Sequence, residues 1–147
     1  MKRLTAVVIA GLIATAPLAQ EVTQADDPML FAPADMADLS EFRWKKRPVL
    51  VFADSEDDPA FIEQMELLEA RKEALAERDV IVLTDTDPKA RAPLRLQMRP
   101  RGFMLVLMGK DGGNKLRKPF PWSVREITRS IDRMPMRQRE IRDAKGG

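Results

Sequence analysis

Residues 48–83 have the sequence PVLVFADSEDDPAFIEQMELLEARKEALAERDVIVL, and this stretch decides the fold. It holds two short apolar runs, 49–53 and 80–83, of the kind that is typical of strands buried on both faces. Between them, Asp58 and Pro59 suit the N-cap and the first residue of a helix, and apolar side chains then recur at helical spacing. Strand, helix and strand predict a βαβ unit with parallel strands and a right-handed crossover.

A β-hairpin is predicted next. The apolar run 103–108 is a third buried strand, and residues 109–114, GKDGGN, favour a tight turn because glycine tolerates positive φ. Residues 115–118 would return as an edge strand, and Ser123 with Glu126 forms a capping box that begins a last helix. We predict an α/β fold, β-α-β then a β-hairpin and a C-terminal α-helix, with a four-stranded mixed sheet flanked by helices. This is the core order of the thioredoxin fold.

The beginning of the chain has the features of a signal peptide. Lys2 and Arg3 precede an apolar stretch, and a cut after Ala19 would fit. A transmembrane anchor is the alternative, but the apolar stretch falls well short of the roughly 20 residues that span a bilayer. The predicted segments are a signal peptide (1–19), a flexible acidic arm (20–38), a thioredoxin-like domain (39–142) and a disordered tail (143–147). We therefore expect a periplasmic or secreted protein with no membrane span after cleavage.

The chain contains no cysteine and no histidine. Without a thiol, thiol oxidoreductase and sulfur-based peroxidase chemistry are excluded. Without an imidazole, Ser-His-Asp and Cys-His pairs and the common zinc sites are excluded as well. Acid-base chemistry by carboxylates needs neither residue type. The composition thus favours a protein that is not an enzyme and that carries no cofactor.

Four short stretches are distinctive in sequence: FRWK at 42–45, RDV at 78–80, LMGKDGG at 107–113 and IDRMPMR at 131–137. They resemble the family of a domain of unknown function numbered 4174, and the resemblance covers residues 39–142. It implies a thioredoxin-like module of small exported bacterial proteins, with related domains in animal extracellular-matrix proteins. It also implies a distant kinship to peroxiredoxins, and it supplies no assigned reaction.

Charge is unevenly distributed along the chain. Residues 20–88 carry 18 acidic and 7 basic side chains, whereas residues 89–147 carry 5 acidic and 16 basic ones. A basic half can bind anions, although solvated surface charge without a specific partner is the commoner case. We predict an envelope protein or an anionic envelope component as the partner. Nucleic acid is a poor candidate, because an exported protein meets little of it.

Two stretches of the chain offer oxygen or sulfur atoms that could bind a metal. Asp54, Asp57 and Asp58 offer the oxygens that Ca²⁺ takes, but acidic residues equally suit the N-terminus of the helix that follows. Met134 and Met136 resemble thioether pairs for Cu(I), but methionine also fills gaps in a core. We predict no metal site, and we keep the three aspartates as candidate binding residues.

Basic residues near the hairpin form the other candidate site. Cations and backbone amides could hold an anion at the glycine-rich turn, which is surrounded by Lys110, Lys115, Arg117 and Lys118. An ordinary hairpin with a charged edge is the alternative. Arg137 is a further candidate, although an ion pair between it and Asp132 would be purely structural.

Two classes of function stay open on these observations. The first is a non-catalytic binding or structural module of the cell envelope, which the residue types favour. The alternative is a peroxiredoxin-related or carboxylate-based enzyme that works without thiol chemistry.

Overall fold

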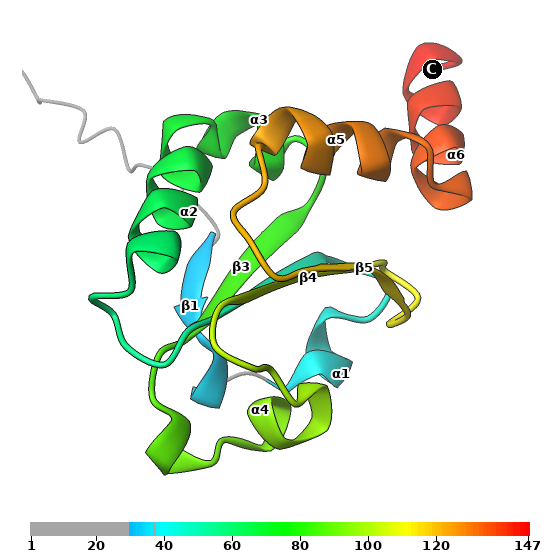
Figure 1. The fold of residues 1–147 in the computed structure, drawn as a ribbon. Helices are drawn as coiled ribbons and strands as arrows, with labels where there is room; N and C mark the ends of the chain where they lie inside the picture. The colour runs from blue at the N-terminus through cyan, green and yellow to red at the C-terminus, as the bar shows by residue number, and fades with distance from the viewer. Residues whose placement is uncertain (1–29, 37) are drawn as a thin grey trace, which may run out of the picture.

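A computed structural model describes residues 30–36 and 38–147 of the protein (Figure 1). A mixed five-stranded sheet, in the order β1-β3-β2-β4-β5, forms its centre. The strands are β1 (Phe31–Pro33), β2 (Arg47–Phe52), β3 (Val80–Asp85), β4 (Met104–Met108) and β5 (Asn114–Lys118). The α/β class, the mixed sheet and the order of its main elements agree with the prediction from sequence.

Helices cover both faces of this sheet (Figure 1). Side chains of α2 (Pro59–Ala70), α3 (Lys72–Ala76) and α5 (Val124–Asp132) pack on one face, and those of α1 (Leu39–Phe42) and α4 (Pro93–Met98) pack on the other. The remaining elements are two 3₁₀ turns, η1 (Ala34–Met36) and η2 (Pro88–Ala90), and the C-terminal helix α6 (Pro135–Lys145). Among the described residues, no helix has the length and apolar character needed to cross a membrane.

The βαβ unit is confirmed. β2 and β3 pair in parallel along their whole length, and α2 and α3 connect them. Val49 and Val51 pack on the side of α2 and α5, whereas Leu50 and Phe52 pack on the side of α4. A fully buried apolar side chain of this size stabilises a fold by about 1.5–3 kcal/mol. Burial on both faces is therefore the reason why this run has no polar position.

The helix caps expected from sequence are also present. The Asp58 carboxylate accepts a hydrogen bond from the Ala60 N–H at 2.8 Å, and α2 starts at Pro59. The Ser123 hydroxyl oxygen accepts one from the Glu126 N–H at 3.3 Å, and α5 starts directly after Ser123.

The sheet has one strand more than predicted. β1 pairs in parallel with β3, and Phe31 lies opposite Val82. This strand falls inside residues 20–38, which were expected to be a flexible arm, so that expectation was wrong for residues 31–33; residues 20–29 and the expected signal peptide lie outside the described residues. A three-residue strand that ends at Pro33 shows no alternation of apolar and polar side chains. Backbone pairing with β3 orders it, and a sequence pattern cannot report such pairing.

Two helix boundaries also differ from the prediction. The helix that begins at Pro59 is interrupted at Arg71, whose φ of −131° is not helical, so α2 and α3 are separate. At the other end, α6 continues to Lys145, through part of the tail that was expected to be disordered. Pro135 keeps Met134 extended, as proline does to the residue before it, and then serves as the first residue of α6.

The hairpin turn between β4 and β5 depends on one glycine. Gly112 has a φ of +82°, a region that costs an L-amino acid about 1–2 kcal/mol. We expect Gly112→Ala to lower the free energy of unfolding by about that amount. Gly113→Ala is the matched control, because its φ is not positive and an added Cβ would lie 3.4 Å from the nearest atom, Asp111 Oδ1. Urea unfolding of both variants checks this, and equal effects would show that the turn conformation is not the cause.

Candidate functional site

Three neighbouring pockets that share lining residues lie along β5. The first, about 380 Å³, lies between the hairpin turn, Trp44 and the start of α6. The second, about 350 Å³, lies between β5 and α5 and shares Lys115 and Met134 with the first. The third, about 360 Å³, lies where the loop before β4 meets the end of β5, and it shares Lys118 with the second. We call the three linked pockets the β5 groove.

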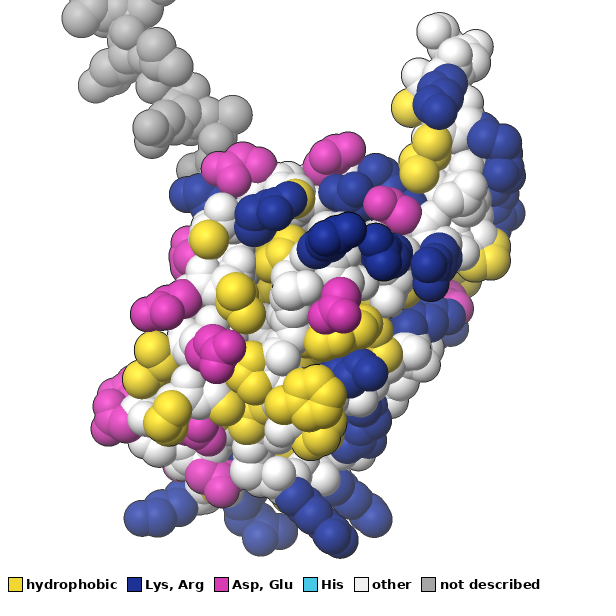
Figure 2. Space-filling model, turned by 45° about the horizontal axis from the view of Figure 1, so that its top comes forward, with side chains coloured by type: hydrophobic (Ala, Val, Ile, Leu, Met, Phe, Trp, Pro, Cys, Tyr) yellow, Lys and Arg dark blue, Asp and Glu magenta, His cyan; other side chains and the backbone are white. Residues whose placement is uncertain are grey.

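Positive charge dominates the β5 groove. Asp111 is the one acidic residue among the described residues that line it. Six basic residues of its lining have no carboxylate within salt-bridge distance in the described part of the chain: Arg99, Arg101, Arg117, Lys118, Arg133 and Arg139. Figure 2 shows many basic side chains on the side of α5 and α6 and further ones along the lower edge of the molecule, whereas acidic ones are more frequent on the side of α2. The charge asymmetry of the sequence is therefore only partly a separation in space.

Apolar side chains form part of the same lining. Leu116, Trp122 and Met134 are half-buried in the pocket between β5 and α5. The Lys118 ammonium nitrogen lies 4.9 Å from the centroid of the Trp122 ring, within the range of a cation–π contact. The groove thus offers cations beside apolar surface, a combination that suits an anion with an apolar part.

Strained backbone also occurs in the lining. Trp44 has a φ of +66° and Arg99 a φ of +50°, which is uncommon for residues other than glycine. The Trp44 N–H donates a hydrogen bond of 2.7 Å to the Lys110 carbonyl oxygen, which helps hold this conformation, while 60% of the Trp44 surface stays exposed. Asp79 and Arg91 have the same conformation outside the groove, so positive φ does not by itself mark the lining.

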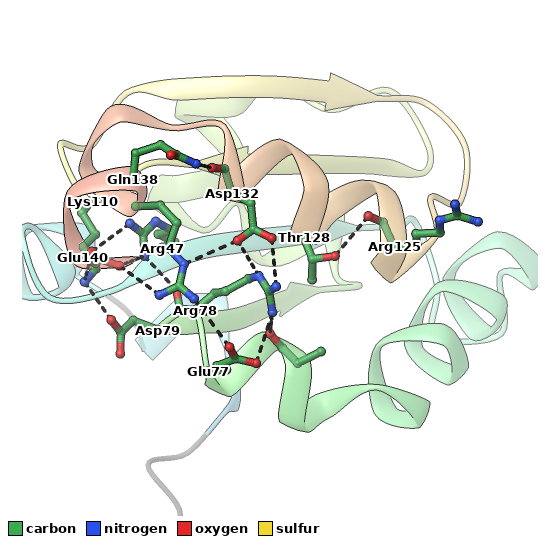
Figure 3. Close-up of polar contacts among 12 residues, drawn as sticks. Arg47, Glu77, Arg78, Asp79, Lys110, Arg125, Thr128, Asp132, Gln138 and Glu140 are labelled. Carbon is green, nitrogen blue, oxygen red and sulfur yellow. Dashed lines mark hydrogen bonds and ion pairs between the residues drawn. The ribbon is translucent and has the colours of Figure 1, made fainter. Parts of the chain in front are cut away.

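A buried ionic network fixes the end of the groove next to α6 (Figure 3). The Glu140 carboxylate of α6 accepts hydrogen bonds from Arg47 Nη2 at 2.9 Å and from Lys110 Nζ at 2.8 Å. Lys110 Nζ also contacts Asp79 Oδ2 at 2.8 Å. The Arg47 side chain is only 1% exposed, so its charge depends on this pairing. Glu140 therefore ties α6 to β2 and to the hairpin.

The network holds Glu140 ionised. Partial burial acts to raise the pKa of the Glu140 carboxyl, but hydrogen bonds from Arg47 and Lys110 outweigh it and lower the pKa to about 2. At neutral pH the carboxylate thus stays charged and keeps both cations in place.

A second ionic cluster joins α5 and α6 to the turn before β3 (Figure 3). Arg78 Nε and Nη2 donate to the two Asp132 carboxylate oxygens, each at 2.9 Å. Arg137 Nε lies 3.4 Å from Asp132 Oδ1, and its Nη1 lies 3.3 Å from Glu140 Oε2. The hydrogen bond from Arg78 lowers the pKa of Asp132. Arg137 is therefore engaged in ion pairs, which was the structural alternative that the sequence left open.

The acidic candidates lie at the opposite end of β2. Asp58 caps α2, the Asp57 N–H donates to the Ser55 hydroxyl at 3.1 Å, and Asp54 Oδ1 lies 3.8 Å from Arg95 Nη1. No group of three potential metal-ligating side chains gathers within residues 30–36 and 38–147. The Asp58 carboxylate thus serves the helix terminus and the Asp54 carboxylate lies beside Arg95, while the Asp57 contact is made by its backbone.

Arg95 and Asp85 form a buried ion pair at this same end. Arg95 Nε donates to Asp85 Oδ2 at 3.0 Å, and Arg95 Nη2 donates to the Ala53 carbonyl oxygen at 2.7 Å. The side chains are 8% and 6% exposed. The pair joins α4 to the ends of β2 and β3, and nothing in the sequence pattern singled it out.

The sequence identified part of the groove. Lys110, Lys115, Arg117 and Lys118 line it, and Arg137 lies in the network beside it. The sequence did not identify the basic residues that other segments contribute: Arg99, Arg101, Arg133 and Arg139. Finding them requires knowing that α5, α6 and the loop before β4 lie near β5 in the folded protein. The one signal available was the basic charge of residues 89–147.

Comparison with known proteins places the chain in a family and a fold. Its fold is similar to that of a reduced 2-Cys peroxiredoxin from Plasmodium vivax, with a TM-score of 0.57 and 16% identity over 70% of this chain and 85% of that one. Prx1a of Plasmodium yoelii gives a TM-score of 0.54 and 17% identity over 70% and 81%. At such identity the likeness shows a thioredoxin-like fold alone. Residues 38–140 match the family described as a domain of unknown function (DUF4174), and the chain belongs to that family.

Proposed function

We propose that the protein is an exported, non-catalytic module that holds an anionic partner of the cell envelope in the β5 groove. One observation carries this proposal: among the described residues, six basic side chains that line the groove have no carboxylate partner, and Asp111 is its one acidic residue. Cations without a carboxylate partner attract anions from solution, most strongly where a concave surface focuses their field. Export is supported by the leader-like features of residues 1–19.

Binding is favoured over catalysis by how the acidic residues are used. Asp58 serves as a helix cap, Asp85 neutralises the buried Arg95, and Glu140 neutralises Arg47. A general acid or base must be free to exchange a proton with a substrate, and these carboxylates are held in hydrogen bonds. The absence of cysteine removes the sulfur chemistry that such a fold could otherwise perform.

A binding assay with two defined anionic probes tests the proposal. The first probe is a vesicle that contains phosphatidylglycerol, and the second is a fluorescent oligoglutamate. Each probe is titrated with the purified protein at low and high ionic strength. We expect binding to at least one of them at low ionic strength and weakening as salt rises, because salt screens exposed charges.

Two variants with equal change in charge show whether the groove is responsible. In the first, Lys115, Lys118 and Arg133 are replaced by serine, which should weaken binding about tenfold or more. In the control, Lys45, Lys89 and Arg91 are replaced by serine; these exposed residues lie outside the groove and should leave binding within about threefold. Absence of binding to both probes, or equal loss in both variants, would contradict the proposal.

A further inference from the structure

β5 has a free edge. It is the last strand of the order β1-β3-β2-β4-β5, and it pairs with β4 alone. In an antiparallel pair the N–H and C=O groups of alternate residues face the neighbouring strand, so those of the other residues face outward. No further element among the described residues pairs with the outer edge of β5. A row of backbone donors and acceptors therefore lies along the outer edge of the strand whose residues line the β5 groove.

A pocket lies beside this strand. It is the middle pocket of the β5 groove, between β5 and α5, and it is lined by Leu116 of the strand, by Ser130 of α5 and by Arg133, the C-cap of α5. β5 is five residues long, and an extended chain of that length spans about 17 Å. Peptides that add a strand to a sheet bind at such exposed edges, where the main chain gives affinity and side-chain pockets give specificity.

Charge restricts the kind of strand that would fit. Lys115, Arg117 and Lys118 lie on β5 itself, and Arg133 is the C-cap of the neighbouring helix α5. Lysines on an edge strand oppose pairing with another basic strand, but they attract an acidic one. Side chains alternate in direction along β5 and along a bound strand, so acidic residues on one face can meet Lys115 and Arg117 while apolar ones on the other face meet Leu116.

We propose that an acidic polypeptide segment in extended conformation binds as a sixth strand against β5. The inference rests on the proposed anion-binding function and names the class of partner for the same groove. A phosphate or a lipid headgroup can satisfy the cations, but it cannot supply the alternating N–H and C=O groups that the strand edge requires. A polypeptide satisfies the cations and the strand edge together.

A heptapeptide of alternating glutamate and valine, with both ends blocked, tests this pairing. Two further peptides carry N-methyl groups either on the glutamates or on the valines, which removes one alternating set of N–H donors without a change in charge. An added strand uses only one set against β5. One N-methylated peptide should therefore lose about tenfold in affinity, as expected for two or three lost backbone hydrogen bonds, while the other stays within about threefold of the parent.

Amide hydrogen exchange gives a second readout. Binding of the parent peptide should slow exchange at alternate residues of 114–118, the amides that face outward in the free protein. Equal affinities of the two N-methylated peptides would overturn strand addition, whether both bind as tightly as the parent or both bind more weakly. Binding to phosphatidylglycerol vesicles without binding to the parent peptide would overturn it too, and would leave the proposed anion-binding function standing. Failure of the peptide, the oligoglutamate and the vesicles together would contradict both.

Discussion

Replacing Asp85 with alanine is expected to lower the free energy of unfolding by about 3–5 kcal/mol. This is the largest effect that we predict for a single substitution in this protein. Asp85 is the carboxylate that neutralises Arg95, and both side chains are more than nine-tenths buried. Its removal leaves a guanidinium group in the interior with carbonyl oxygens as its hydrogen-bond acceptors and with the largely exposed Asp54 carboxylate, 3.8 Å away, as its remaining ion-pair partner among the described residues. Urea denaturation at neutral pH measures the loss.

Two controls show whether the loss of stability comes from the unpaired buried charge of Arg95 or from the removal of a carboxylate in general. Glu77→Ala removes a carboxylate that is 67% exposed and lies 3.6 Å from Arg78, and it should change stability by no more than about 1 kcal/mol. The double variant Asp85→Ala with Arg95→Met removes both charges, so it should recover much of the stability that Asp85→Ala loses. A double variant as unstable as Asp85→Ala would show that the unpaired charge is not the cause.

Glu140→Gln is expected to give the second largest effect. Hydrogen bonds from Arg47 and Lys110 lower the pKa of Glu140 to about 2, and because the side chain is 27% exposed to solvent that screens the charge, the ionised carboxylate is expected to stabilise the fold by about 1–3 kcal/mol. The substitution should lower the free energy of unfolding by about that amount at neutral pH, because Arg47 and Lys110 lose their shared carboxylate.

The pH dependence of this effect has a definite direction. Because the pKa is lower in the folded state, the stabilisation is fully present above the unfolded value near 4.5 and is lost as the pH falls through about 2. The difference in unfolding free energy between the original protein and Glu140→Gln should therefore shrink between pH 5 and pH 2. Urea denaturation across that range tests this. A difference that stays constant with pH would contradict the assignment of the network to Glu140.

The main part of the fold could be predicted from sequence because its signals are local. The runs 49–53 and 80–83, the glycine-rich turn and the caps at Asp58 and Ser123 each depend on neighbouring residues, and each has the structure expected. β1 depends instead on pairing with β3, about 50 residues away in the chain. No local pattern encodes that contact.

The candidate site was harder to predict for the same physical reason. Lys110, Lys115 and Arg117 were identified because they flank the turn, whereas Arg101 and Arg133 reach the groove from distant segments. Arg47 and Glu140 are 93 positions apart in sequence, and both belong to strongly charged stretches that suggest a solvated surface. Burial at the first position of β2 turns the Arg47 charge into a structural requirement.

The most direct test of the central claim, that this thioredoxin-like protein binds an anionic partner in the β5 groove, is a map of backbone amide chemical shifts. The spectrum of the isotope-labelled protein is followed while oligoglutamate is added at low ionic strength. The groove predicts that the largest changes fall on residues 99–101, 115–118 and 133–139. Changes centred on residues 54–58, or spread evenly over all basic residues, would contradict it.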